Sequence, residues 1–162
     1  DLHTAYRRQR QMCIRDSYGM VGGQTVDVES ENTCDMTKEK LDFIYRLKTS
    51  ALIEASMMIG AVLAGATGSE QKIVEEVASK VGLAFQIQDD ILDVTSTMEV
   101  LGKPIGSDEK NHKSTYVTYE GIEKAKQDVA DLSEKAIAQM ETLVVKNEFL
   151  TELLRYLISR EK

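Results

Sequence analysis

The segment Leu-Ala-Phe-Gln-Ile-Gln-Asp-Asp-Ile-Leu-Asp, residues 83–93, combines apolar side chains with three carboxylates. On an α-helix, which turns about 100° per residue, Asp89 and Asp93 lie about 40° apart, and Asp90 and Asp93 about 60° apart. Carboxylates this close repel one another unless a cation lies among them. Oxygen ligands without His or Cys suit Mg²⁺, which binds one or two carboxylates and completes its shell with water and substrate phosphate. The alternative interpretation is an acidic helix face exposed to solvent.

The hydrophobic pattern around this segment is helical. Ile87, Ile91 and Val94 have the spacing of a core stripe on the face opposite the aspartates. Thr37 and Ser69 are candidate N-caps for the helices that follow them. No strand alternation or repeat is visible, so the sequence predicts an all-α protein. Helices are expected over residues 18–30, 38–66, 70–95, 114–144 with a pause near Gly121, and 147–160.

Small residues mark two places where helices can approach closely. Gly22 and Gly23 allow tight packing of the first predicted helix on a neighbour. The Thr-Ser-Ala stretch at residues 49–51 permits the same in the second. Both places therefore predict helix contacts close to the backbone.

The composition suits one soluble helical domain, because the 162 residues are 42% hydrophobic with a single proline. The net charge of −7 argues against a nucleic-acid partner. The most apolar stretch, residues 51–66, contains Glu54 and is shorter than the roughly 20 residues of a membrane span. Two histidines are too few for a zinc or di-iron site. Cys13 and Cys34 have no paired spacing, which indicates free thiols and a cytoplasmic protein.

Residues 1–17 differ in character from the rest. This stretch holds four arginines against two aspartates and has no apolar core of the kind that a signal peptide needs. We therefore expect an artefactual or non-native leader at residues 1–17 and a single domain over residues 18–162.

Five segments occur in an order that is typical of one enzyme family. They resemble the trans-prenyl diphosphate synthases, the farnesyl and geranylgeranyl diphosphate synthase family, whose second aspartate-rich motif corresponds to residues 89–93. The resemblance implies an isoprenoid-synthase-type helical bundle, of which this chain is the C-terminal half. The segments are Gly-Met-Val-Gly-Gly-Gln with Asp27 (19–27), Tyr-Arg-Leu-Lys-Thr-Ser-Ala-Leu (45–52), Phe-Gln before the aspartates (85–86), Gly-Lys-Pro-Ile-Gly-Ser-Asp (102–108) and Lys-Ser-Thr-Tyr (113–116).

The reaction that this resemblance implies is an electrophilic alkylation. An allylic diphosphate ionises, isopentenyl diphosphate attacks the cation, and loss of a proton restores a double bond. Mg²⁺ is the implied cofactor, held by Asp89 and Asp93 and less directly by Asp90. Family members pair as homodimers, so we expect a homodimer in the full-length parent. Product chain length depends on residues outside this sequence.

The resemblance also assigns the substrate-binding and catalytic side chains. From pattern alone, Lys48 and Lys103 could equally be solvated lysines, and the Thr49 hydroxyl could bond the carbonyl one turn back. The assigned residues are Lys48 and Lys103 on the allylic diphosphate, Lys113 as added positive potential, Thr49 and Gln86 facing the developing cation, and Phe85 beside the homoallylic substrate.

The family's first aspartate-rich motif and upstream basic segment do not occur before Gly19. We therefore expect the parent to be a prenyltransferase and the isolated chain to be inactive. A non-catalytic helical protein that binds diphosphate or supports assembly is the main alternative. A cyclising terpene synthase ranks below it, because the Asn-Ser-Glu type of metal motif is not seen. A di-metal oxidase would need two Glu-x-x-His motifs on helices, and the sequence does not contain two.

Overall fold

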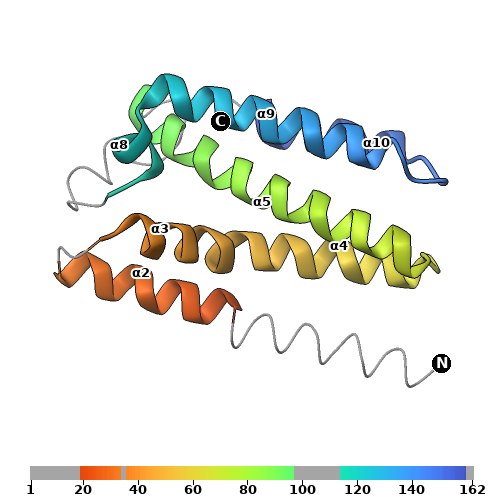
Figure 1. Ribbon diagram of the computed structural model, residues 1–162, viewed down its shortest axis with the longest axis horizontal. Helices are drawn as coiled ribbons and strands as arrows, with labels where there is room; N and C mark the ends of the chain where they lie inside the picture. Colours follow the sequence, from red (N-terminus) through yellow and green to blue (C-terminus); the bar gives the residue numbers. More distant parts are fainter. Residues whose placement is uncertain (1–18, 34–35, 97–113, 160–162) are drawn as a thin grey trace.

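The computed structural model describes residues 19–33, 36–96 and 114–159, and the regular secondary structure in these ranges is helical (Figure 1). The prediction of an all-α bundle is confirmed. Within the described ranges, no helix is both long and apolar enough to cross a membrane. The elements are α2 (Val21–Thr33), α3 (Lys38–Tyr45), the π-helical turn η2 (Arg46–Ser50), α4 (Ala51–Leu63), α5 (Gly68–Thr95), α8 (Tyr116–Glu120), α9 (Ile122–Met140) and α10 (Glu148–Ser159).

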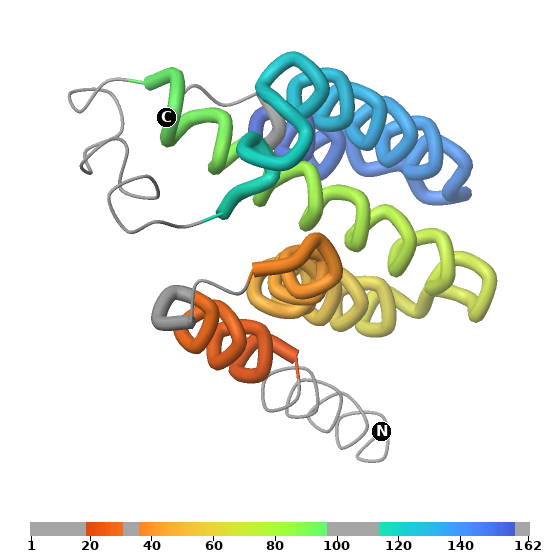
Figure 2. The backbone as a smooth tube through the Cα atoms, turned by 60° about the vertical axis from the view of Figure 1, so that its left-hand side comes forward, coloured from red at the N-terminus to blue at the C-terminus, as the bar shows by residue number. Residues whose placement is uncertain are grey.

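Helix α5 is the centre of the bundle. It packs against the continuous rod of α3, η2 and α4 on one side and against α9 on the other (Figure 1). Helix α2 lies on the outer side of the α3–α4 rod, and α10 lies beside α9 (Figure 2). The helix with the aspartates therefore lies against η2 and α4, which carry residues 46–52, and against α8, which begins at Tyr116.

Two clusters of buried side chains form the core, and α5 contributes to both. One cluster joins α3, α5 and α9 around Ile87, which is fully buried. The other joins α5, α9 and α10 around Val77 and Val81. Burial of one such side chain contributes about 1.5–3 kcal/mol. The predicted core stripe is confirmed for Ile87 and Ile91 but is wrong for Val94, which is 62% exposed in the last turn of α5.

Helix caps follow the local sequence. The Thr37 hydroxyl accepts a hydrogen bond from the backbone N–H of Lys40, as predicted for an N-cap. The prediction of Ser69 as a cap is wrong, because Thr67 is the N-cap of α5 instead. Its hydroxyl accepts from the N–H of Glu70, and the Glu70 carboxylate accepts from the N–H of Thr67 at 2.8 Å, which completes a capping box.

The long helix predicted over residues 38–66 contains a π-helical turn that the sequence did not reveal. At its end the N–H of Ala51 donates to the carbonyl of Arg46, five residues back. The Ser50 hydroxyl donates to the Tyr45 carbonyl at 3.0 Å, also five residues back. Such turns occur often at functional sites, and this one holds Lys48 and Thr49.

Candidate functional site

The π-helical turn η2 is held between two glycines. A β-carbon on Gly23 of α2 would lie 2.6 Å from the backbone nitrogen of Lys48. A β-carbon on Gly82 of α5 would lie 2.5 Å from Cα of Ser50. The predicted close approach is thus confirmed at Gly23 and at residues 49–51, whereas no atom lies within 4 Å of a β-carbon built on Gly22. Backbone contact on both sides fixes the turn that presents Lys48 and Thr49.

Thr49 and Gln86 meet across the interface of η2 and α5. The Thr49 hydroxyl donates to Oε1 of Gln86 at 2.7 Å, and both side chains are half-buried. Their separation of 37 positions in the sequence means that the fold, not local structure, brings them together. The Lys-Thr segment therefore lies directly against the helix of the aspartates.

Lys48 forms an ion pair with Asp27 of α2. Its Nζ lies 2.6 Å from Oδ2 of Asp27, and the exposed fractions of the two side chains are 30% and 1%. A buried carboxylate is costly unless a charged or hydrogen-bonding partner compensates it. The ion pair therefore restrains the lysine that the resemblance assigns to the allylic diphosphate.

The three aspartates of α5 differ in their surroundings. Asp90 is 5% exposed and accepts hydrogen bonds from the Tyr45 hydroxyl and from the backbone N–H of Tyr116, the latter at 2.9 Å. Asp93 is 4% exposed, whereas Asp89 is half-buried. In the part of the chain that the structure describes, no group of three His, Cys, Asp or Glu side chains could hold a metal ion. Their role as metal ligands stays a prediction.

The donor set at α5 still fits Mg²⁺ in its chemistry. Asp89 and Asp93 are carboxylates one turn apart, and Mg²⁺ commonly uses only one or two carboxylates, with water and phosphate completing its shell. Asp90 is the least suited of the three, because Tyr45 and Tyr116 already donate to it. The less direct role that the resemblance implies for Asp90 stays a prediction.

Tyr116, at the start of α8, links the aspartate helix to α9. Its ring stacks on that of Tyr45 with centroids 6.5 Å apart, and its hydroxyl donates to Asp128 at 2.8 Å. Burial, followed by the hydrogen bond to Asp128, raises the pKa of the Tyr116 phenol. A hydrogen bond from Lys124, together with one from Tyr116, lowers the pKa of the Asp128 carboxyl. The first turn of α8 is thus anchored to both neighbouring helices.

Three other predicted residues are less informative. Phe85 is half-buried on α5, one position before Gln86. Lys103 and Lys113 lie outside the described residues. Of the predicted residues, the structure therefore places Lys48 and Thr49 of η2 beside α5, the helix that carries Gln86 and the aspartates.

Tyr45 and Asp27 lie within the segments quoted for the family resemblance, but neither residue was predicted from the sequence to have a role. Tyr45 lies four residues after Leu41 and one after Ile44, so it belongs to a buried stripe. A buried tyrosine usually needs a hydrogen-bond partner for its hydroxyl. That rule could have pointed to a polar partner on a neighbouring helix, and the partner is Asp90.

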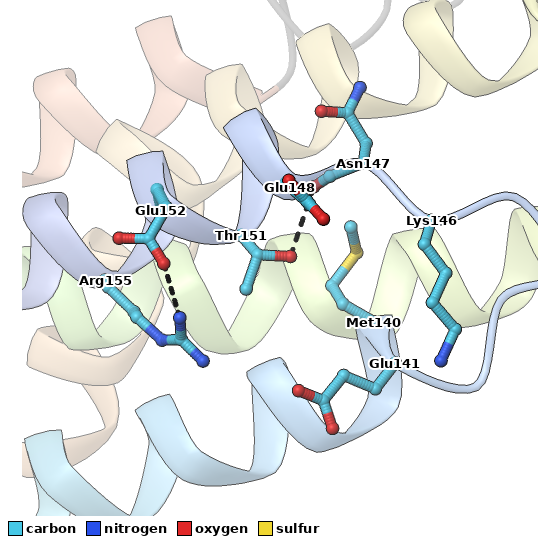
Figure 3. A pocket seen from close by; sticks show the side chains of 8 residues that line it. All are labelled: Met140, Glu141, Lys146, Asn147, Glu148, Thr151, Glu152 and Arg155. Carbon is cyan, nitrogen blue, oxygen red and sulfur yellow. Dashed lines mark hydrogen bonds and ion pairs between the residues drawn. The ribbon is translucent and has the colours of Figure 1, made fainter.

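A cavity of about 410 Å³ lies away from these residues, between the end of α9 and α10 (Figure 3). Arg155 pairs with Glu152 at its edge, and the Thr151 hydroxyl bonds the carbonyl of Asn147. Apart from buried Met140, its side chains are exposed or half-buried. Its lining is Met140, Glu141, Lys146, Asn147, Glu148, Thr151, Glu152 and Arg155, none of which the sequence predicted as a site residue.

Curated relatives cover most of this chain. A geranylgeranyl diphosphate synthase from Cyanophora paradoxa is 47% identical over 118 residues, 73% of this chain and 39% of the relative. A farnesyl diphosphate synthase from Geobacillus stearothermophilus is 36% identical over 143 residues, 88% of this chain and 48% of the relative. The chain thus spans less than half the length of these two relatives.

A solved structure extends the similarity to the fold. The geranyltransferase from Helicobacter pylori, in complex with magnesium and isoprenyl diphosphate, is 31% identical. Its TM-score is 0.78, and the match covers 98% of this chain and 52% of that one. A family model described as polyprenyl synthetase matches residues 4–154, which begins inside the predicted leader, so the boundary at residue 17 stays a prediction. The chain belongs to the polyprenyl synthetase family, which confirms the resemblance to the trans-prenyl diphosphate synthases.

Proposed function

We propose that the chain forms one half of the active site of a trans-prenyl diphosphate synthase. The full-length parent condenses an allylic diphosphate with isopentenyl diphosphate to give a longer trans-prenyl diphosphate. The observation that carries the proposal is the hydrogen bond of 2.7 Å between Thr49 and Gln86. It joins the predicted diphosphate-binding segment to the helix of the predicted metal ligands. The relatives that are similar to this chain are named as prenyl diphosphate synthases, which supports the same reaction.

The side chains of this chain act on the allylic substrate. Lys48, together with Lys103, binds the diphosphate, and Lys113 adds positive potential. When the bond between carbon and the diphosphate oxygen breaks, fixed positive charge in a site that excludes water stabilises the departing anion. The oxygens of Thr49 and Gln86 face the positive charge that develops on the allyl group.

Mg²⁺ is the proposed cofactor. Asp89 and Asp93 would hold the ion, and Asp90 would have a less direct role. The ion would supply positive charge to the leaving diphosphate. Phe85 would line the apolar space beside isopentenyl diphosphate. The double bond of that substrate supplies the electron pair of the new carbon–carbon bond, and the carbocation that results then loses a proton to restore a double bond. We further propose a cytoplasmic homodimer for the parent.

The isolated 162-residue chain is proposed to be inactive in catalysis. Residues 89–93 are the only Asp-Asp-x-x-Asp segment within it. Loss of even one group that stabilises the transition state costs about 3–4 kcal/mol, so loss of a whole motif removes detectable turnover. Alone, the chain would then act only as a non-catalytic helical protein that binds diphosphate or supports assembly.

Two measurements on the purified chain test these proposals. Titration calorimetry with inorganic diphosphate should show binding that depends on Mg²⁺, and the double variant Asp89→Asn, Asp93→Asn should lose the Mg²⁺ dependence. Incubation with dimethylallyl diphosphate and labelled isopentenyl diphosphate should give no product. Product formation would contradict the inactivity, whereas a folded chain without any diphosphate affinity would contradict the proposed site.

A chimera tests the activity of the parent. Residues 19–162 of this chain would replace the matching part of the Geobacillus stearothermophilus farnesyl diphosphate synthase, which is 36% identical to it. We expect prenyl transfer that depends on Mg²⁺, and loss of this activity in the Lys48→Ala chimera. A chimera that folds and keeps its activity after Lys48→Ala would rule out the proposed role of Lys48.

A further inference from the structure

Asp27 belongs to α2, a helix to which the proposed reaction assigns no role. Its side chain is buried, with an exposed fraction of 1%, yet its carboxylate lies 2.6 Å from the Nζ of Lys48. The two residues are 21 positions apart and come from different helices. A contact of this kind depends on how α2 packs on η2.

The packing of α2 on η2 fixes where the carboxylate of Asp27 lies. Gly23 precedes Asp27 by four residues and so lies on the same face of α2. A β-carbon there would come within 2.6 Å of the Lys48 backbone nitrogen and 2.9 Å of the Leu47 side chain. The α2 backbone therefore touches the same residue whose side chain Asp27 holds. The packing of α2 therefore restrains both the backbone and the side-chain ammonium group of Lys48.

We propose that Asp27 is a positioning residue that holds the Lys48 ammonium in place before a diphosphate binds. This inference rests on the proposed role of Lys48. An ammonium group has three donors, so one can remain on Asp27 while the others bind phosphate oxygens. Ordering a long lysine side chain in advance removes an entropic cost from the binding step. Asp27 acts through Lys48 and does not touch the substrate.

The position of the ammonium can be measured without a ligand. Carbon-13 relaxation at the ε-carbon of Lys48 should show restricted motion in the wild-type chain and greater motion in Asp27→Asn, because a neutral amide holds an ammonium less firmly than a carboxylate does. Asp42→Asn is the control, since it removes the same charge from an exposed site on α3. Equal Lys48 mobility in the wild type and in Asp27→Asn would overturn the inference.

Asp27→Glu separates position from charge, because it keeps the charge and moves the carboxylate outward by one methylene. We expect this variant to bind inorganic diphosphate in the presence of Mg²⁺ about tenfold more weakly, the factor that corresponds to one impaired hydrogen bond with a charged group. In the Lys48→Met background the same substitution should have no further effect. A similar loss in that background, or no loss in the wild-type background, would contradict the inference.

The two measurements keep the inference and the proposed function apart. A wild-type chain that is folded but binds no diphosphate contradicts the proposed site, while the relaxation experiment still decides whether Asp27 restrains Lys48. If Asp27→Glu does not fold, because a buried site rejects the extra methylene, the comparison of Asp27→Asn with Asp42→Asn decides the question alone.

Discussion

Gly82 of α5 approaches Ser50 so closely that a β-carbon on Gly82 would lie 2.5 Å from both Cα and Oγ of Ser50. Gln86 follows one turn later on the same face of α5 and accepts the hydrogen bond of Thr49. The close contact at Gly82 thus brings α5 near enough to the π-helical turn for the Gln86 side chain to accept this hydrogen bond.

Gly82→Ala should destabilise the protein, because the new methyl group meets backbone atoms that cannot move aside. Overpacking of this kind costs about 1–3 kcal/mol. Gly60→Ala is the matched control, since Gly60 is also helical and a β-carbon there meets no atom within 4 Å. It should stabilise the protein by about 0.5–1 kcal/mol through helix propensity. Urea unfolding measures both, and equal stability of the two variants would contradict the role of Gly82.

Gly23 and Gly22 provide a second pair, adjacent within α2. Gly23→Ala should cost about 1–3 kcal/mol and shift the amide resonances of Leu47 and Lys48, because its methyl group would meet both residues. Gly22→Ala should leave these resonances unchanged, since a β-carbon there has no neighbour within 4 Å. Two-dimensional NMR checks the shifts. Unchanged resonances in a folded Gly23→Ala variant would refute the contact.

Much of the helical framework was predictable, because hydrophobic spacing and turn residues act locally. Thr37 caps its helix through a hydroxyl three residues from its partner, and Gly121 separates α8 from α9 with a φ of +82° that glycine adopts easily. The family resemblance implied that Thr49 and Gln86 face the same part of the substrate, and the two side chains are hydrogen-bonded to each other. These conclusions need only local rules and a family resemblance.

The orientation of Asp90 could not be predicted from spacing. Three aspartates within two turns share one broad side of a helix, and only the neighbouring elements decide which of them points inward. Here Tyr45 of α3 and Tyr116 of α8 both donate to Asp90. The π-helical turn was not predicted either, and the two glycines that approach it most closely, Gly23 and Gly82, come from other helices.

Tyr45→Phe should destabilise the protein by about 2 kcal/mol. It removes the hydroxyl that donates to the buried Asp90 carboxylate, and hydrogen bonds to charged groups contribute about 1.5–3 kcal/mol. Tyr119→Phe is the control, because that hydroxyl donates to the Met36 carbonyl at an exposed position. It should cost less than about 1 kcal/mol. Thermal unfolding compares the two variants. An equal loss of stability would show that the hydrogen bond to Asp90 contributes no more than one to a neutral carbonyl.

The pair of Lys124 and Asp128 should make stability depend on pH in mild acid. The hydrogen bond from Lys124, and after it that from Tyr116, lowers the pKa of Asp128 below its ordinary value of 3.8. A lowered carboxyl pKa stabilises the folded state above the unfolded pKa, and this stability is lost as the pH falls through the folded pKa. Because the Lys124 side chain is exposed to solvent, the contribution of the pair to stability is small.

Asp128→Asn isolates this contribution. At pH 6 the wild type should unfold at a higher temperature than the variant, and the difference should shrink as the pH falls below about 4. Tyr116→Phe keeps the aromatic ring and the Lys124 partner but removes the phenol donor, so it should retain part of the pH dependence. Unfolding temperatures across this range measure all three proteins. A difference between the wild type and Asp128→Asn that stays constant from pH 6 to pH 2 would mean that Asp128 stabilises the fold by packing and not by its charge.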